Sequence, residues 1–76
     1  MLDEVIKILN EIVGADEGEI EADLNLFEAG LLDSFAVIQM FVALEEKFGV
    51  TLAVETLPRE EIVTPALIAR RVEQAL

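Results

Sequence analysis

The residues best placed for chemistry are an aspartate and a serine, Asp33 and Ser34, in the stretch "LFEAGLLDSFAVIQMF" of residues 26–41. A glycine-containing turn precedes the pair, and a long apolar segment follows it. If a helix begins here, its free backbone N–H groups and its dipole favour an anion, such as a phosphate attached to the serine. Serine and aspartate are also common helix caps, so a purely structural role for the pair stays open.

The rest of the composition gives Ser34 no partner for catalysis. The chain has no histidine, cysteine, tryptophan or tyrosine. Their absence excludes a Ser-His pair, a cysteine nucleophile and a disulfide, and it removes the usual zinc ligands. Carboxylates are the only groups left for acid-base work, and they would need unusual burial to titrate near neutral pH. We therefore expect a protein that is not an enzyme, without catalytic residues and without a metal.

The charge of the chain restricts its partners. Sixteen acidic residues face five basic ones, for a formal net charge of −11. Contact with nucleic acid needs a patch of Lys and Arg, and anionic membranes repel such a chain, so we expect neither as a partner. From Ile8 to Glu46 there are ten acids and no basic residue. This pattern serves either solubility or docking to a basic protein surface.

The sequence carries no targeting signal. Its start, "MLDEV", lacks the basic and apolar regions of a signal peptide. The longest uninterrupted apolar run, Met40 to Leu44, is far too short to span a membrane. Together with the lack of cysteine, this predicts a cytoplasmic protein with no direct membrane insertion. The length predicts one domain over residues 1–76, and we expect a monomer.

Apolar residues recur at helical spacing in three segments that must position the Asp33–Ser34 pair. The first covers about residues 2–13, the second runs from Ser34 to Phe48, and the third opens at residues 64–65. Each segment has residues suited to its ends, which are Gly14, Asp33, Gly49, Thr64 and Pro65.

The connecting segments are predicted to differ from each other. Pro58 limits residues 55–62 to a short, irregular helix. Residues 15–32 form a long loop, with one short helical turn at residues 24–27. This loop has too many apolar residues to lie free, so we expect it to cross the helices and bury Ile20, Leu24, Leu26, Phe27, Leu31 and Leu32. The predicted fold is all-α: a small four-helix bundle with three main helices plus one short third helix.

The helix from Ser34 has more apolar residues than one buried face needs. One stripe is the natural core face: Val37, Met40, Phe41, Leu44 and Phe48. A second stripe lies on the opposite side and is either covered by the crossing loop or exposed. If exposed, it indicates a surface for docking to proteins. The candidate partner-binding residues are then Phe35, Ile38 and Val42 in the centre, with Glu28, Glu45 and Glu46 as a charged rim.

At these residues the sequence resembles the acyl carrier protein family, in which an Asp-Ser-Leu motif opens the second helix of a four-helix bundle. The motif stands here as Asp33-Ser34-Phe35. The resemblance covers nearly the whole chain and is closest to the D-alanyl carrier branch, through "LFEAGLLDSF", "ALEEKFGV" and "IVTP". It implies that Ser34 carries a 4′-phosphopantetheine arm, while Asp33 helps to position the serine or a metal during attachment. Ala36 and Gln39 replace the acids common in fatty-acid carriers, which makes a fatty-acid synthase partner less expected.

The resemblance also implies three partners. A phosphopantetheinyl transferase would attach the arm, an adenylating ligase would load its thiol with an acyl or aminoacyl group as a thioester, and an acyltransferase would unload it. The implied cargo is D-alanine for teichoic acid D-alanylation, and a fatty, polyketide or other amino-acid group stays open. Two alternatives outside the carrier class are an unmodified acidic interaction module and a calcium loop at residues 16–23. The acids of that loop do not follow EF-hand spacing.

Overall fold

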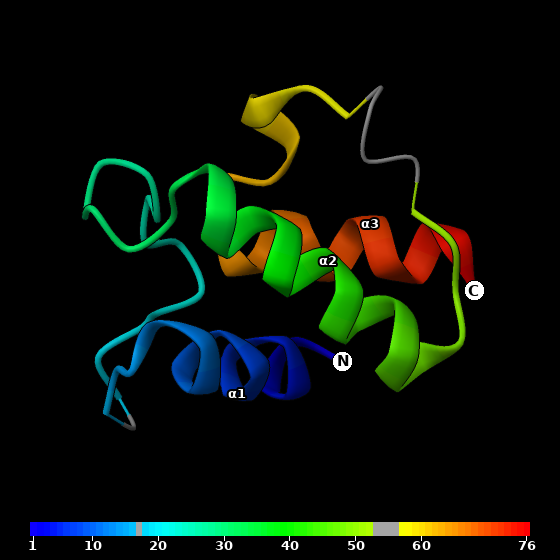
Figure 1. Cartoon of the computed structure of the whole chain (residues 1–76), viewed down its shortest axis with the longest axis horizontal. Coiled ribbons are helices and arrows are strands. Elements are labelled where there is room, and N and C mark those ends of the chain that lie inside the picture. The colour runs from blue at the N-terminus through cyan, green and yellow to red at the C-terminus, as the bar shows by residue number, and fades with distance from the viewer. Residues whose placement is uncertain (17, 53–56) are drawn as a thin grey trace.

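Three α-helices form the framework of the protein: α1 (Leu2–Val13), α2 (Ser34–Phe48) and α3 (Pro65–Ala75). A single turn of 3₁₀-helix, η2 (Arg59–Glu61), precedes α3. The computed structural model describes residues 1–16, 18–52 and 57–76, and within these ranges it contains no strand. Helix α1 packs against both α2 and α3 (Figure 1). The predicted all-α fold and its three main helices are confirmed.

The helix ends are set by the residues predicted for them. The Asp33 carboxylate accepts a hydrogen bond of 2.8 Å from the Ala36 N–H, which makes it the N-cap of α2. Thr64 caps α3 in the same way. Gly14 and Gly49 end α1 and α2 with φ of 71° and 66°. This left-handed conformation is one that glycine adopts without strain.

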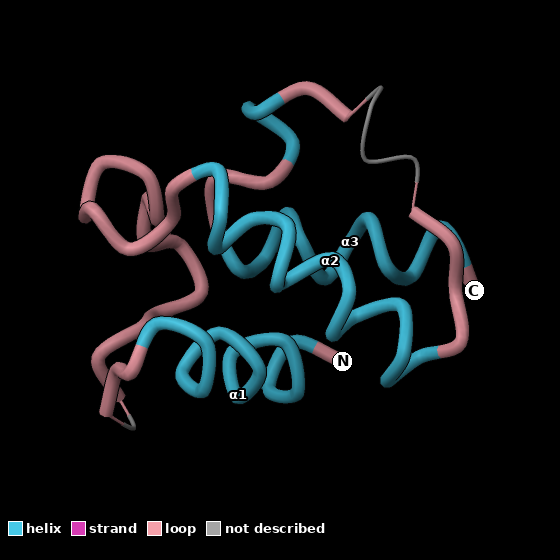
Figure 2. The backbone as a smooth tube through the Cα atoms, in the orientation of Figure 1, coloured by secondary structure: helices cyan, strands magenta, loops and turns pink. Residues whose placement is uncertain are grey.

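The long loop closes the end of the bundle between α1 and α2 (Figure 2) and contributes to the core. Ile20, Leu26 and Leu32 are buried, whereas Leu24, Phe27 and Leu31 are half-buried. The Leu26 N–H donates to the Val63 carbonyl at 2.7 Å, which joins the loop to the segment before α3. The expectation that the loop buries apolar residues is therefore confirmed.

The turn predicted at residues 24–27 is displaced along the chain, because turns occupy residues 26–30. The side-chain oxygen of Asn25 accepts from the N–H groups of Phe27 and Glu28, at 3.1 and 3.0 Å. The Asn25 carbonyl accepts from the Ala29 N–H at 3.0 Å. These are the bonds of an N-cap, so Asn25 fixes the start of this turn one residue after itself.

The short helix predicted within residues 55–62 is the single turn η2 behind Pro58. Residues 55 and 56 of that prediction lie outside the described residues. The core beneath it gathers side chains from all three helices and from the loop. Its largest fully buried members are Leu9, Leu26, Met40, Leu44, Ile68, Val5, Val72 and Pro65.

One side chain fixes the chain beyond the end of α2. The half-buried Glu45 accepts a hydrogen bond of 2.8 Å from the backbone N–H of Leu52. Its neighbour Glu46 is exposed. A hydrogen bond to a charged group contributes more to stability than one between neutral groups. The two adjacent acids therefore differ in their structural role.

This difference predicts unequal effects of the same substitution. Glu45→Ala should lower the free energy of unfolding by about 1–2 kcal/mol, because the Leu52 N–H loses its charged acceptor. In thermal unfolding this corresponds to a drop in Tm of at least about 4 °C. Glu46→Ala is the matched control and should stay within about 0.5 kcal/mol of the parent. Equal stabilities of the two variants would contradict the assignment.

Candidate functional site

Ser34 is the only serine in the chain, and there is no tyrosine. It is the first residue of α2, and it is exposed. Of the threonines that the structure describes, Thr64 uses its hydroxyl to cap α3, and the exposed Thr51 lies in the segment that follows α2. The helix start therefore presents a single accessible primary hydroxyl.

The Asp33 carboxylate next to this hydroxyl is used in the cap of α2. Its Oδ1 atom accepts a hydrogen bond from the Ala36 N–H. The chain has no histidine that could act as a base. A serine hydroxyl is a weak nucleophile unless a base or a metal activates it. The structure gives Asp33 the role of helix cap, and its role during attachment of an arm stays a prediction.

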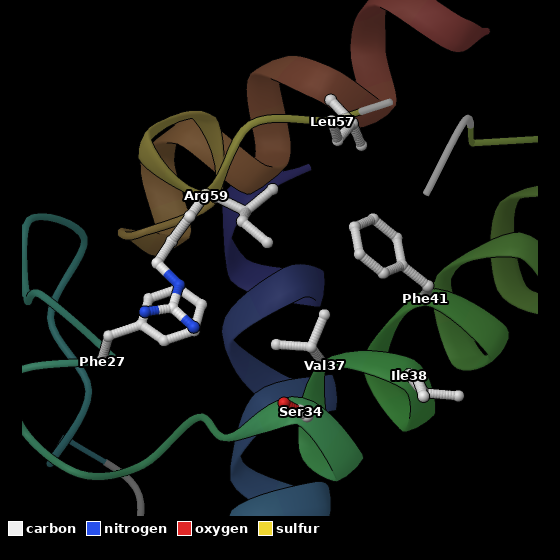
Figure 3. A pocket seen from close by; sticks show the side chains of 8 residues that line it. Phe27, Ser34, Val37, Ile38, Phe41, Leu57 and Arg59 are labelled. Atoms are coloured by element: carbon white, nitrogen blue, oxygen red, sulfur yellow. The ribbon is translucent and has the colours of Figure 1, made fainter. Parts of the chain in front are cut away.

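A cavity of about 300 Å³ adjoins Ser34 (Figure 3). One wall comes from α2, and the other comes from the loop before α2 and from the segment around η2. Within residues 1–16, 18–52 and 57–76 the lining is apolar apart from two polar side chains, and it consists of Phe27, Ser34, Val37, Ile38, Phe41, Leu57, Arg59 and Ile62. A hydroxyl on the rim of such a cavity suits a long, largely uncharged group attached to the serine.

Arg59 supplies the only charge among the described residues that line this cavity. Its guanidinium lies over the ring of Phe27, 4.5 Å from the ring centroid (Figure 3). A cation over an aromatic face is attracted by the ring quadrupole. The contact joins η2 to the loop before α2 at the mouth of the cavity.

The second apolar stripe of α2 is exposed and not covered by the loop. Phe35, Ile38 and Val42 are 70%, 57% and 49% exposed. These positions are three and four residues apart, so they lie on one helix face. Ile38 also lines the cavity, so the stripe is continuous with it. Among the described residues, only Leu76 joins them as an exposed large hydrophobic. An apolar strip of this kind next to Ser34 suits contact with another protein.

The predicted acidic rim is only partly available for contact. Glu28 and Glu46 are exposed, Glu28 in the loop before α2 and Glu46 near the end of α2. The carboxylate of Glu45 instead accepts a hydrogen bond from the Leu52 N–H. The structure therefore leaves two of the three acids free to meet a cationic partner.

Sequence reasoning did not find the cavity or the position of Arg59. Phe27 and Arg59 are far apart in the chain, and Arg59 belongs to no motif. A single arginine after a proline resembles any surface residue, so no pattern would have singled it out. Only folding of the loop and η2 against α2 brings the two side chains together.

The described ranges contain neither a metal-binding cluster nor a membrane-spanning helix. Residues 1–16, 18–52 and 57–76 contain no group of three or more His, Cys, Asp or Glu placed to hold a metal ion. In the same ranges no helix has both the length and the apolar character needed to cross a membrane.

Comparison with known proteins identifies the family. A family model described as "Phosphopantetheine attachment site" matches residues 3–72. A D-alanyl carrier protein of Lacticaseibacillus rhamnosus is 44% identical over an alignment of 80 positions, which covers 99% of each chain. Proteins of the same name are 42% identical in Lacticaseibacillus casei (strain BL23), over 99% of each chain, and 39% in Listeria monocytogenes, over 91% of this chain and 88% of the relative.

The predicted resemblance is thus confirmed over nearly the whole length of the chain. The exposed hydroxyl beside an apolar cavity fits the covalent group that the family model describes. The chain belongs to the family of proteins with a phosphopantetheine attachment site, and it is a carrier protein that bears a covalently attached 4′-phosphopantetheine.

Proposed function

We propose that Ser34 is the residue that bears the arm, and that the protein carries D-alanine on it for transfer to an acceptor outside this chain. Attachment at Ser34 is supported by the position of this residue. Ser34 is the sole serine, and it is exposed at the start of α2 on the rim of the cavity. The second part is supported by relatives with the name D-alanyl carrier protein at 44% and 42% identity. A fatty, polyketide or other amino-acid group is the alternative cargo.

The arm supplies a terminal thiol that holds the cargo as a thioester. This accounts for a carrier chain that contains no cysteine itself. The chain contributes the attachment point and the surface that other proteins recognise. Ser34 offers its hydroxyl, Asp33 holds the first turn of α2 in place, and the helix N-terminus favours a phosphate at that position.

Carrier proteins are generally non-catalytic, and we propose that this one has no enzymatic activity of its own. Its lack of histidine and cysteine supports that proposal. A phosphopantetheinyl transferase then attaches the arm, an adenylating ligase loads the cargo, and an acyltransferase unloads it. We also propose a monomeric, single-domain protein in the cytoplasm, where an ATP-dependent ligase can load it.

The proposed docking surface has the three exposed apolar residues at its centre: Phe35, Ile38 and Val42. Anchors three and seven residues along one helix suit insertion of that helix face into an apolar groove. Glu28 and Glu46 would flank this centre, while Glu45 contributes mainly through its bond to Leu52. With a net charge of −11, association with a basic partner should be fast and should weaken as salt is added.

The attachment point is tested by intact mass. After incubation with coenzyme A and a broad-specificity phosphopantetheinyl transferase, the parent protein should gain the mass of one phosphopantetheine. Ser34→Ala should gain nothing, because the only primary hydroxyl is lost. Thr51→Val, which removes an exposed hydroxyl elsewhere, should be modified like the parent. A mass gain that survives Ser34→Ala would overturn the assignment.

The docking surface is tested by the kinetics of the same modification. Phe35→Ala and Ile38→Ala should each lower kcat/KM of the transferase by about 5- to 30-fold, the usual cost of removing a central apolar anchor. Leu76→Ala is the control, since Leu76 is 70% exposed, as Phe35 is, but lies at the far end of the chain. It should change kcat/KM by less than about twofold. If the three variants behave alike while their melting temperatures match the parent, the stripe is not the docking surface.

A further inference from the structure

A phosphodiester on Ser34 gains from the helix N-terminus but also meets negative charge close by. The chain already carries a net charge of −11, and Asp33 stands directly before the serine. The Asp33 carboxylate also accepts a hydrogen bond from the Ala36 N–H. This N–H is one of the donors at the start of α2 that have no partner within the helix. The helix N-terminus therefore offers the phosphate fewer donors than an uncapped helix would, with a negative charge beside them.

The cavity next to Ser34 contains a cation that can compensate this charge. Arg59 and Ser34 line the same cavity, and among the lining residues that the structure describes Arg59 is the only charged one (Figure 3). The other basic residues belong to other parts of the fold: Lys7 to α1, Lys47 to the last turn of α2, and Arg70 and Arg71 to α3. Lys47 is thus at the end of α2 opposite to Ser34.

Arg59 can exchange its contact with Phe27 for a contact with a phosphate. Its guanidinium rests on the face of Phe27, with 4.5 Å between its central carbon and the ring centroid. Arg59 is exposed, and a cation–π contact at an exposed site is weak. A guanidinium forms shorter and stronger, often bidentate, hydrogen bonds with phosphate oxygens. A phosphate within reach would therefore compete successfully with the ring.

We propose that Arg59 is the residue that positions the arm, by binding the phosphodiester at Ser34 and leaving the face of Phe27 when it does so. The inference rests on the proposed attachment at Ser34. Pairing on this side draws the phosphate toward the cavity and directs the beginning of the pantetheine chain into the space between Val37 and Leu57. The contact with Phe27 holds the guanidinium at the cavity mouth before the arm is attached.

The test compares the holo forms of three variants by ³¹P NMR. Arg59→Gln removes the cation, and Arg59→Lys keeps the charge without the bidentate geometry. Arg70→Gln is the matched control, because it makes the same change in net charge at an exposed residue of α3 outside the cavity. The ³¹P resonance of holo Arg59→Gln should move away from that of the parent, Arg59→Lys should fall between them, and Arg70→Gln should coincide with the parent. An unchanged resonance in Arg59→Gln, or an equal change in Arg70→Gln, overturns the proposal.

A second readout separates arm positioning from a purely structural role of Arg59. For each protein, Tm is measured with and without the arm, so that any effect of the substitution on the fold itself cancels in the difference. The change in Tm on attachment should be about 2–5 °C more favourable in the parent than in Arg59→Gln. This gap should shrink in high salt, because an exposed ion pair is screened. If Arg59 only supports Phe27, both proteins change equally on attachment, and the proposal fails.

Mass spectrometry of the same samples distinguishes this inference from the proposed function. If no variant with Ser34 intact acquires the arm, attachment at Ser34 itself has failed. If all of them acquire it while the ³¹P resonance and the change in Tm are the same, only the role of Arg59 has failed.

Discussion

The site depends on where α2 begins. The hydrogen bond from the Ala36 N–H to the Asp33 carboxylate sets that point. The rotation of the helix about its axis is set by packing, because its main apolar face must meet the core. Met40, Phe41 and Leu44 then enter the core. On the same helix, Ser34 and the stripe headed by Phe35 are left exposed. Because successive residues are about 100° apart around a helix, burial of the core face leaves this stripe on the outer side.

The chain separates the attachment of cargo from its chemistry. It has no histidine to act as a base at Ser34 and no cysteine to provide a thiol. What it provides is an exposed serine, an apolar strip and cavity next to it, and a strongly acidic surface. A carrier must meet several partners and leave each one. An electrostatically steered encounter followed by a small apolar contact suits that need, because it combines rapid association with modest affinity.

Much of this arrangement could be predicted from the sequence, because it depends on local rules. Helix periodicity and the capping residues Asp33, Gly49 and Thr64 located the helices, and the surplus of apolar residues on α2 indicated a second face. What the sequence did not reveal depended on side chains that act over a distance. The turn expected at residues 24–27 lies at residues 26–30, where Asn25 caps it. The bond of Glu45 to the Leu52 N–H and the meeting of Arg59 with Phe27 both required the folded chain.

Loading of the holo protein with D-alanine tests the central claim most directly. The protein bearing the arm is incubated with D-alanine, ATP and a D-alanine-adenylating ligase, and the intact mass is followed before and after treatment with hydroxylamine, which cleaves thioesters. The account predicts a gain of one alanyl group that hydroxylamine removes, and no gain in the unmodified protein or in Ser34→Ala. Alanylation of the protein without its arm, or alanylation that resists hydroxylamine, would contradict it.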